Sequence, residues 1–402
     1  MACLIAVFLL VGSAEAAFAQ AQPQGVEVTQ LAAPDAFTTP GRDTGLPLSL
    51  WVGASAQTAK TVLPLLAAKP LSPAAAALAR RVLATGAPGP RNTGRDPALA
   101  AARANALMFQ GDPKAAARVL ARAPGLDRNS DLARAAAETM LLSGDDQHAC
   151  QLAEGLSIGR DEVYWLKLRT YCQAIAGQAA QAQLTFELVQ AQVKDPIFTR
   201  LMSAKLAGGG NPGAASLRNG LDYALSHSLG LDLAAARPSA AVAAALSTAD
   251  PAPPVFDPAG AAPDLIALAE ALAGREPVRE AVTQALVEAA ASTDPKARAR
   301  GQIGLLLALA VSGSATPEAR GQIAALGVPE GKAPVGRSIA LDAAGEQKLM
   351  GEAALLSLWT CAEAGPAGVA MGDRIRIVRA LHAVGLEVDA RAFALEGLLA
   401  LK

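Results

Sequence analysis

Side chains suited to catalysis or metal binding are few in this chain, and they are scattered. The three histidines, His148, His227 and His382, lie far apart, and none has a Cys, Asp or Glu at metal-ligand spacing on the same helix face. Phosphate loops, Gly-x-Ser-x-Gly elbows and His-Glu-x-x-His helices are missing from the sequence. The adjacent carboxylates Asp145 and Asp146 lie in a polar turn, where nothing raises a pKa for acid catalysis. The sequence therefore favours a non-catalytic protein that needs no cofactor and no metal.

Two tyrosines and a lysine form a pattern suited to binding. Tyr164, Lys167 and Tyr171 are spaced by three and four residues, so they share one face of a predicted helix. Tyrosine beside a cation is common where proteins contact partners. In the alternative interpretation, Tyr164, Trp165 and Tyr171 are aromatic residues that pack between helices.

Length and composition restrict the class of protein. The chain has 402 residues, more than one compact core usually holds, with 18% charged residues and a formal net charge of −1. That balance gives no electrostatic reason to expect a nucleic-acid partner. Aromatic residues make up only 3%, while alanine and leucine are abundant, which favours helices over a β-sandwich or barrel.

The N-terminus reads as an export signal. The apolar run Leu4–Val11 is too short to span a bilayer, and Ala17-Phe18-Ala19 predicts cleavage after Ala19, although no Lys or Arg precedes the run. We interpret residues 1–19 as a signal peptide and residues 20–47 as a flexible leader; the alternative for 1–19 is a buried first helix. No later apolar segment is long enough to span a membrane. The Ala, Gly, Pro and Arg bias is typical of GC-rich bacterial genomes, so we expect a periplasmic protein.

A repeat of 33 residues organises the middle of the chain. Four glycines are spaced by 33 residues, and each is followed five residues later by alanine; the pairs are Gly111/Ala116, Gly144/Ala149, Gly177/Ala182 and Gly210/Ala215. Glycine can end a helix in the left-handed conformation, and a small alanine lets two helices cross closely. Each unit is therefore predicted to be a helical hairpin that stacks on its neighbours.

This pattern resembles the tetratricopeptide repeat over about residues 97–225, although most consensus aromatic and Pro positions are missing. The resemblance implies an all-α fold, a right-handed α-solenoid of stacked helical hairpins that becomes irregular towards the C-terminus. It also implies that the face of Tyr164, Lys167 and Tyr171, with Arg134 and Glu138 alongside, lines a concave surface that holds a peptide.

The resemblance also suggests a role for two cysteines. In a tetratricopeptide stack, Cys150 and Cys172 would lie on adjacent antiparallel helices, so a disulfide is plausible in an oxidising compartment. The alternative is two buried thiols. Cys361 is predicted to be a core residue.

Further helical segments surround the repeats. Ser72-Pro73 begins one predicted helix, with Ser72 as its cap, and another covers 57–67. The predicted C-terminal helices cover 265–273, 278–291, 299–311, 318–326, 352–362, 373–384 and 389–401. The domains we expect are tetratricopeptide-like repeats at 48–248, a Pro-rich linker at 249–263 and an irregular α-solenoid at 264–402, with a loop near 327–337.

These features together predict a non-catalytic periplasmic scaffold or adaptor. We expect it to bind a protein or peptide partner of the cell envelope through a concave helical surface. Two alternatives remain open: a helical support module of a peptidoglycan enzyme, or a self-associating structural protein.

Overall fold

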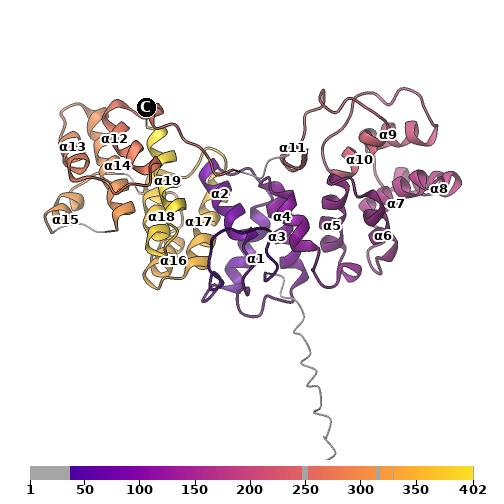
Figure 1. Ribbon diagram of the computed structural model, residues 1–402, viewed down its shortest axis with the longest axis horizontal. Coiled ribbons are helices and arrows are strands. Elements are labelled where there is room, and N and C mark those ends of the chain that lie inside the picture. Colours follow the sequence, from indigo (N-terminus) through magenta and orange to yellow (C-terminus); the bar gives the residue numbers. More distant parts are fainter. Residues whose placement is uncertain (1–36, 247–251, 314–316, 329, 402) are drawn as a thin grey trace, which may run out of the picture. The chain divides into compact units, whose positions relative to one another are not determined.

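The computed structural model describes residues 37–246, 252–313, 317–328 and 330–401. All regular structure in these ranges is helical (Figure 1), which confirms the predicted all-α class. The predicted signal peptide lies outside the described residues, as do most of the predicted leader and part of the Pro-rich linker. In the described ranges, no helix has the length and apolar character that crossing a membrane requires.

The helices fall into an earlier and a later series. The earlier helices are α1 Ala56–Leu65, α2 Pro73–Ala84, α3 Pro97–Phe109, α4 Pro113–Leu120, α5 Ser130–Leu142, α6 Asp146–Gly155, α7 Val163–Ile175, α8 Ala179–Gln192, α9 Pro196–Leu206, α10 Gly220–Ser228 and α11 Ala240–Leu246. The later helices are α12 Ile266–Ala273, α13 Glu280–Ala290, α14 Pro295–Ser312, α15 Pro317–Ala324, α16 Val335–Glu346, α17 Met350–Ala364, α18 Met371–Ala383 and α19 Glu387–Leu399.

Three of the four predicted glycine joints connect two helices as expected. Gly111, Gly144 and Gly177 have φ angles of 85°, 77° and 74°, and they lie between α3 and α4, α5 and α6, and α7 and α8. Glycine suits these joints because a side chain is strained at positive φ. The alanine five residues after each glycine is fully buried in the second helix of its pair. The spacing in the sequence therefore marks real helical hairpins.

The prediction of a fourth hairpin of this kind is wrong. Gly210 lies in an irregular connection after α9, and Ala215 lies in the same connection outside any helix. The glycine run Gly208–Gly210 explains the difference, because glycine loses more backbone freedom in a helix than any other residue. The next helix begins only at Gly220, where the Asn219 side chain accepts a hydrogen bond from the N–H of Asp222.

The sequence did not predict α16, whose start falls in the expected loop. Its buried residues are Ser338, Leu341, Ala344 and Gly345. Only one of them is large and apolar, so the helical period of hydrophobic residues is weak. A Cβ atom at Gly345 would lie 3.4 Å from the backbone of Ala380 in α18, which shows how closely these two helices approach.

The later helices pack directly against the first ones. In Figure 1 the yellow helices α17 and α19 lie beside the indigo helices α1 and α2, and contacts join α17 to both and α19 to α2. One hydrophobic core contains residues of α1–α5 together with residues of α12–α14 and α16–α19. A second core contains residues of α5–α10. Helix α5 contributes to both cores, so its position is fixed from two sides.

Candidate functional site

A cavity of about 400 Å³ lies between α3, α5, the start of α10 and α11. Met108 and Phe109 from α3 and Leu142 from α5 provide apolar walls, and Val242 of α11 adds another. Val242 is fully buried against Leu142 and Leu217, which holds α11 at the cavity. A volume of this size matches pockets that bind small molecules or side chains of a partner.

Arg134 of α5 is the most available polar group of the cavity. Its side chain lies over the Tyr164 ring, with 4.7 Å between the guanidinium carbon and the ring centroid. Among the described residues, its guanidinium makes no hydrogen bond or ion pair, and Arg134 is exposed. Stacking on an aromatic ring orients the guanidinium while leaving its donors available. The side-chain amide of Asn105, across the cavity on α3, also has no hydrogen-bond partner in the described part of the chain.

Glu138 lies one turn further along α5 and fixes the far wall of the cavity. Its Oε2 accepts a hydrogen bond from the N–H of Gly220 at 2.5 Å, which ties α10 to α5. Burial raises the pKa of Glu138, although the bond from Gly220 and the nearby Tyr164 and Arg134 oppose that increase. Burial and the charge of Glu138 also raise the pKa of Tyr164. The protonated form of Glu138 is therefore more favourable here than in water.

Lys167 takes part in an ion-pair network that closes the α7–α9 region. Its Nζ donates to Oδ2 of Asp195 at 2.7 Å and lies 5.2 Å from the centroid of the Phe198 ring. Arg218 donates to the same carboxylate at 3.2 Å and also pairs with Asp222. Burial raises the pKa of Asp195, but hydrogen bonds from Lys167, the Phe198 N–H and Arg218 outweigh it and hold that pKa at about 2. Lys167 is thus committed to an internal partner.

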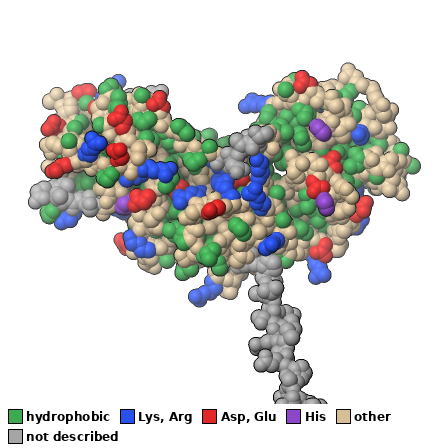
Figure 2. Space-filling model, viewed as in Figure 1, with side chains coloured by type: hydrophobic (Ala, Val, Ile, Leu, Met, Phe, Trp, Pro, Cys, Tyr) green, Lys and Arg blue, Asp and Glu red, His purple; other side chains and the backbone are tan. Residues whose placement is uncertain are grey.

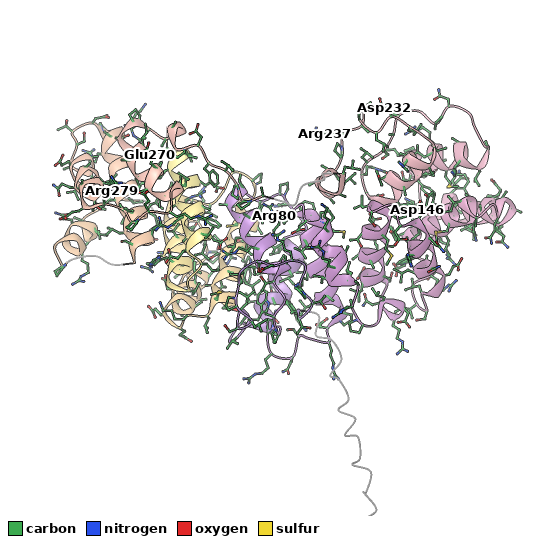
Figure 3. All side chains as sticks on the ribbon, viewed as in Figure 1. Arg80, Asp146, Asp232, Arg237, Glu270 and Arg279 are labelled. Carbon is green, nitrogen blue, oxygen red and sulfur yellow. A yellow bond between two sulfur atoms is a disulfide. The ribbon has the colours of Figure 1, made fainter. Side chains whose placement is uncertain are left out.

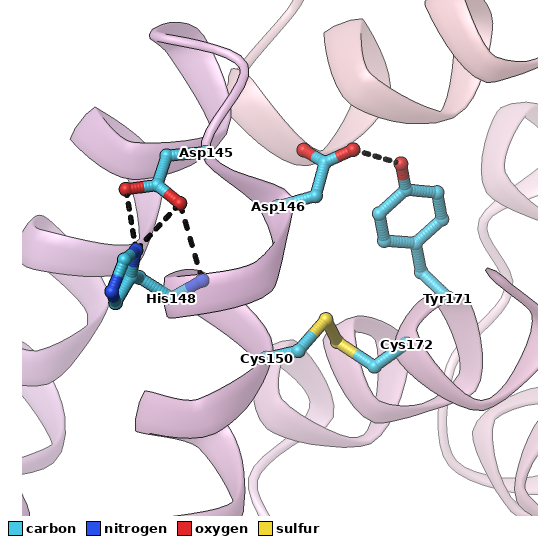
Figure 4. Close-up of a disulfide and its surroundings, with 6 residues drawn as sticks. All are labelled: Asp145, Asp146, His148, Cys150, Tyr171 and Cys172. Atoms are coloured by element: carbon cyan, nitrogen blue, oxygen red, sulfur yellow. Dashed lines mark hydrogen bonds and ion pairs between the residues drawn. A yellow bond between two sulfur atoms is a disulfide. The ribbon is translucent and has the colours of Figure 1, made fainter. Parts of the chain in front are cut away.

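Tyr171 is fully buried in the second core. Its hydroxyl donates to Oδ2 of Asp146 at 2.8 Å, and burial, together with that carboxylate, raises the pKa of Tyr171. Figure 4 shows this bond beside Cys150 and Cys172, whose Sγ atoms lie at disulfide distance, 1.95 Å apart, between α6 and α7. Tyr171 therefore packs in the structure, as the alternative interpretation of the aromatic residues expected.

The remaining chemistry-bearing residues lie apart from the cavity. His148 contacts Asp145 at 2.8 Å (Figure 4), His227 stacks on Tyr223, and His382 lies by Glu387 at 2.8 Å. Cys361 is a buried free thiol, and burial raises its pKa to about 12. Within the described ranges, no group of three or more His, Cys, Asp or Glu side chains is arranged to hold a metal ion.

The structure therefore brings together three of the five residues predicted to bind a partner. Arg134, Glu138 and Tyr164 contact one another, and the first two line the cavity. The other wall comes from Arg218–Gly220, about eighty residues further along the chain than Glu138, and from α11, about a hundred residues further along. The repeat pattern is lost in that region, so no sequence signal pointed to it. Comparison of this chain with protein-family models, curated proteins and solved structures found no match.

Proposed function

We propose that this chain is a non-catalytic scaffold or adaptor that binds a protein or peptide segment at the cavity beside α5. The observation that carries the proposal is the unpaired guanidinium of Arg134, oriented by Tyr164 in the lining of a cavity that has both apolar and polar walls. A partner segment that places apolar side chains between α3 and α11 would bring acceptor groups to Arg134 and Asn105. Successive hairpins α3/α4, α5/α6 and α7/α8 support a tetratricopeptide-like solenoid as the frame.

We also propose that the protein acts in the bacterial periplasm, on a partner from the cell envelope. The cysteine pair at disulfide distance supports this location, because disulfides persist in oxidising compartments. The signal-like N-terminal sequence supports export.

The test is crosslinking in cells followed by capture of the tagged protein and identification of bound chains by mass spectrometry. The double variant Asn105→Ala, Arg134→Gln removes the unpaired amide and the unpaired guanidinium of the lining, and neither residue belongs to a hydrophobic core. Arg122→Gln is the matched control, because Arg122 is an exposed arginine outside the cavity lining. We expect wild type and Arg122→Gln to capture the same envelope partner and the double variant to lose it.

The thermal unfolding midpoint of the double variant separates binding from folding. The change in this midpoint should correspond to a loss of at most about 1 kcal/mol in the free energy of unfolding, which is the usual contribution of an exposed cation–π contact. Equal capture by the double variant, or capture of no specific chain by wild type, would contradict the proposal. Crosslinking of the protein only to itself would favour the self-associating alternative.

A further inference from the structure

Helix α16 has an apolar outer face that the described part of the chain leaves uncovered. Its contacts with α17 and α18 bury the other side of the helix, which carries Leu341 and Ala344. On the outer side, Val335 and Ile339 lie one turn apart and are 72% and 64% exposed. Two large apolar side chains therefore point away from the core on the same side of one helix.

The remaining positions of this outer side have small side chains, so another helix can approach closely. Gly336 and Ala340 are exposed, and Ala343 is half-buried. Among the described residues, a Cβ atom at Gly336 would have no neighbour within 4 Å. The α12–α14 end of the molecule differs, since Figure 2 shows acidic and basic side chains close together there, and Figure 3 labels Glu270 and Arg279 among them. We call the uncharged set the α16 face: Val335, Gly336, Ile339, Ala340 and Ala343.

Opposite charges lie at the two ends of the α16 face. Lys332 precedes the helix and is held there because its N–H donates to Oδ2 of Asp373 at 2.6 Å. Glu346 is the last residue of α16. Both side chains are exposed, and in the described part of the chain neither makes a hydrogen bond or an ion pair. A partner of the α16 face can therefore pair with an acid at one end and a base at the other.

The charged side chains between these ends are already paired within the chain. Arg337 donates to both carboxylate oxygens of Glu363, at 2.7 and 2.8 Å, and lies over the ring of Trp359 at 4.3 Å from the centroid. Asp342 forms an ion pair with Arg379. A second protein packed on the α16 face would therefore meet no uncompensated charge except at its two ends.

We propose that the α16 face binds a second copy of this chain, with the two α16 helices antiparallel across a two-fold axis at Ile339. In this register Val335 faces Ala343 of the partner subunit, so a large side chain meets a small one. Lys332 lies opposite Glu346 of the partner subunit, and the two-fold axis repeats this pair at the other end. One helix pair buries little surface, so the dimer is weak and reversible. The α16 face shares no residue with the cavity lining, so this inference does not rest on the proposed function.

Helix α8 shows that exposed apolar residues alone do not support such a dimer. Leu184 and Leu188 also lie one turn apart and are 63% and 50% exposed. Antiparallel pairing of two α8 helices about these leucines would place Lys194 opposite Gln178, which is uncharged. The α16 face is distinguished by charges at its ends that match a second copy of itself.

Sedimentation velocity of the full chain measures the dimer, and the range from about 1 μM to about 1 mM covers the affinity of a small interface. Ile339→Glu places two like charges together at the two-fold axis. Leu184→Glu is the matched control, because Leu184 is exposed to nearly the same extent on α8. The charge reversals Lys332→Glu and Glu346→Lys are measured singly and together.

We expect wild type and Leu184→Glu to dimerise with the same affinity, and Ile339→Glu to dimerise at least about tenfold more weakly. Each single charge reversal turns both end pairs repulsive and should weaken the dimer about threefold or more. The double reversal restores opposite charges across the axis and should return the affinity to that of wild type. Added salt should reduce the differences between the charge variants.

Three results would overturn the proposal. The first is a wild type that stays monomeric over the whole range, and the second is an Ile339→Glu variant that dimerises like wild type. The third is a double charge reversal that remains as weak as the single ones, because the helices would then not be antiparallel in this register. Circular dichroism checks that each variant is folded. If Ile339→Glu unfolds, the charge reversals still decide the question, because Lys332 and Glu346 are exposed.

Discussion

Substitution of Glu352, at the start of α17, tests the contact between α17 and α1. Its Oε2 accepts a hydrogen bond from the N–H of Ser55 at 2.8 Å, and its Oε1 accepts from the hydroxyl of Thr58 at 2.7 Å. Ser55 is the residue that caps α1, so the carboxylate of Glu352 lies at the positive end of that helix. Beside it, the N–H of Gly351 donates to the carbonyl of Leu50 at 2.8 Å.

The size of the effect follows from these two hydrogen bonds. A hydrogen bond to a charged group contributes about 1.5–3 kcal/mol. Glu352→Ala removes both, and water replaces part of the loss because Ser55 is half-buried, so we expect a destabilisation of about 2–4 kcal/mol. Glu352→Gln keeps one neutral acceptor in place and should cost about 1 kcal/mol.

Urea unfolding followed by circular dichroism measures these differences. The control is Glu346→Ala, since Glu346 is exposed at the end of α16 and takes part in no described hydrogen bond or ion pair. Its free energy of unfolding should stay within about 0.5 kcal/mol of wild type. If Glu352→Ala unfolds like this control, the carboxylate of Glu352 does not stabilise the start of α1, and the contribution worked out from its two hydrogen bonds is refuted.

Two further predictions concern the α6–α9 region. The bond between Cys150 and Cys172 joins residues 22 positions apart in the sequence. In the loop-entropy description, reducing this bond, or making the double change Cys150→Ala, Cys172→Ala, should lower the free energy of unfolding by about 3 kcal/mol. An unfolding curve insensitive to reductant would contradict this prediction. Asp195 is held ionised in the fold with a pKa of about 2, against about 4 in the unfolded chain, so its stabilisation is present above pH 4 and lost as pH falls towards 2. Between pH 5 and pH 2 the free energy of unfolding of wild type should therefore fall by about 2 kcal/mol more than that of Asp195→Asn. Urea unfolding at several pH values measures this difference. Parallel losses in both proteins would refute the role of Asp195.

The predictions from sequence succeeded where local chemistry determines the structure. Gly111, Gly144 and Gly177 mark helix joints because positive φ requires glycine, and this requirement is visible in a single residue type at a regular spacing. The same spacing failed at Gly210, because the neighbouring glycines oppose a helix there and no large apolar face requires one. Spacing alone therefore identifies a joint only where both flanking segments are good helix formers.

The candidate site was predicted only in part, for a related reason. Arg134, Glu138 and Tyr164 share the register of adjacent repeats, so the repeat alignment placed them together. Lys167 has the same helical spacing as Tyr164, but its partner Asp195 lies 28 residues away in α9, and nothing in the sequence links the two. The cavity itself depends on α11, which packs on α3, α4 and α5 from outside the repeat.

The contacts of α1 and α2 with the later helices show how far contacts between distant residues can be inferred from the sequence. Helices α1 and α2 have no acidic residue in their first turn. The Ser55 side chain caps α1 by accepting a hydrogen bond from the N–H of Thr58, whereas the Ser72 side chain makes no capping bond in α2. Both N-termini are completed by glutamates from far along the chain, since Glu352 binds α1 and Glu396 accepts from the N–H of Ala74 in α2 at 2.8 Å. Helices α3 and α4 also lack first-turn acids, but Asp caps of their own satisfy them locally. A helix start without its own side-chain cap does not by itself predict a distant acceptor, since α8 also lacks a cap and a first-turn acid and no such acceptor is described for it; only the tertiary structure shows that Glu396 supplies one at α2.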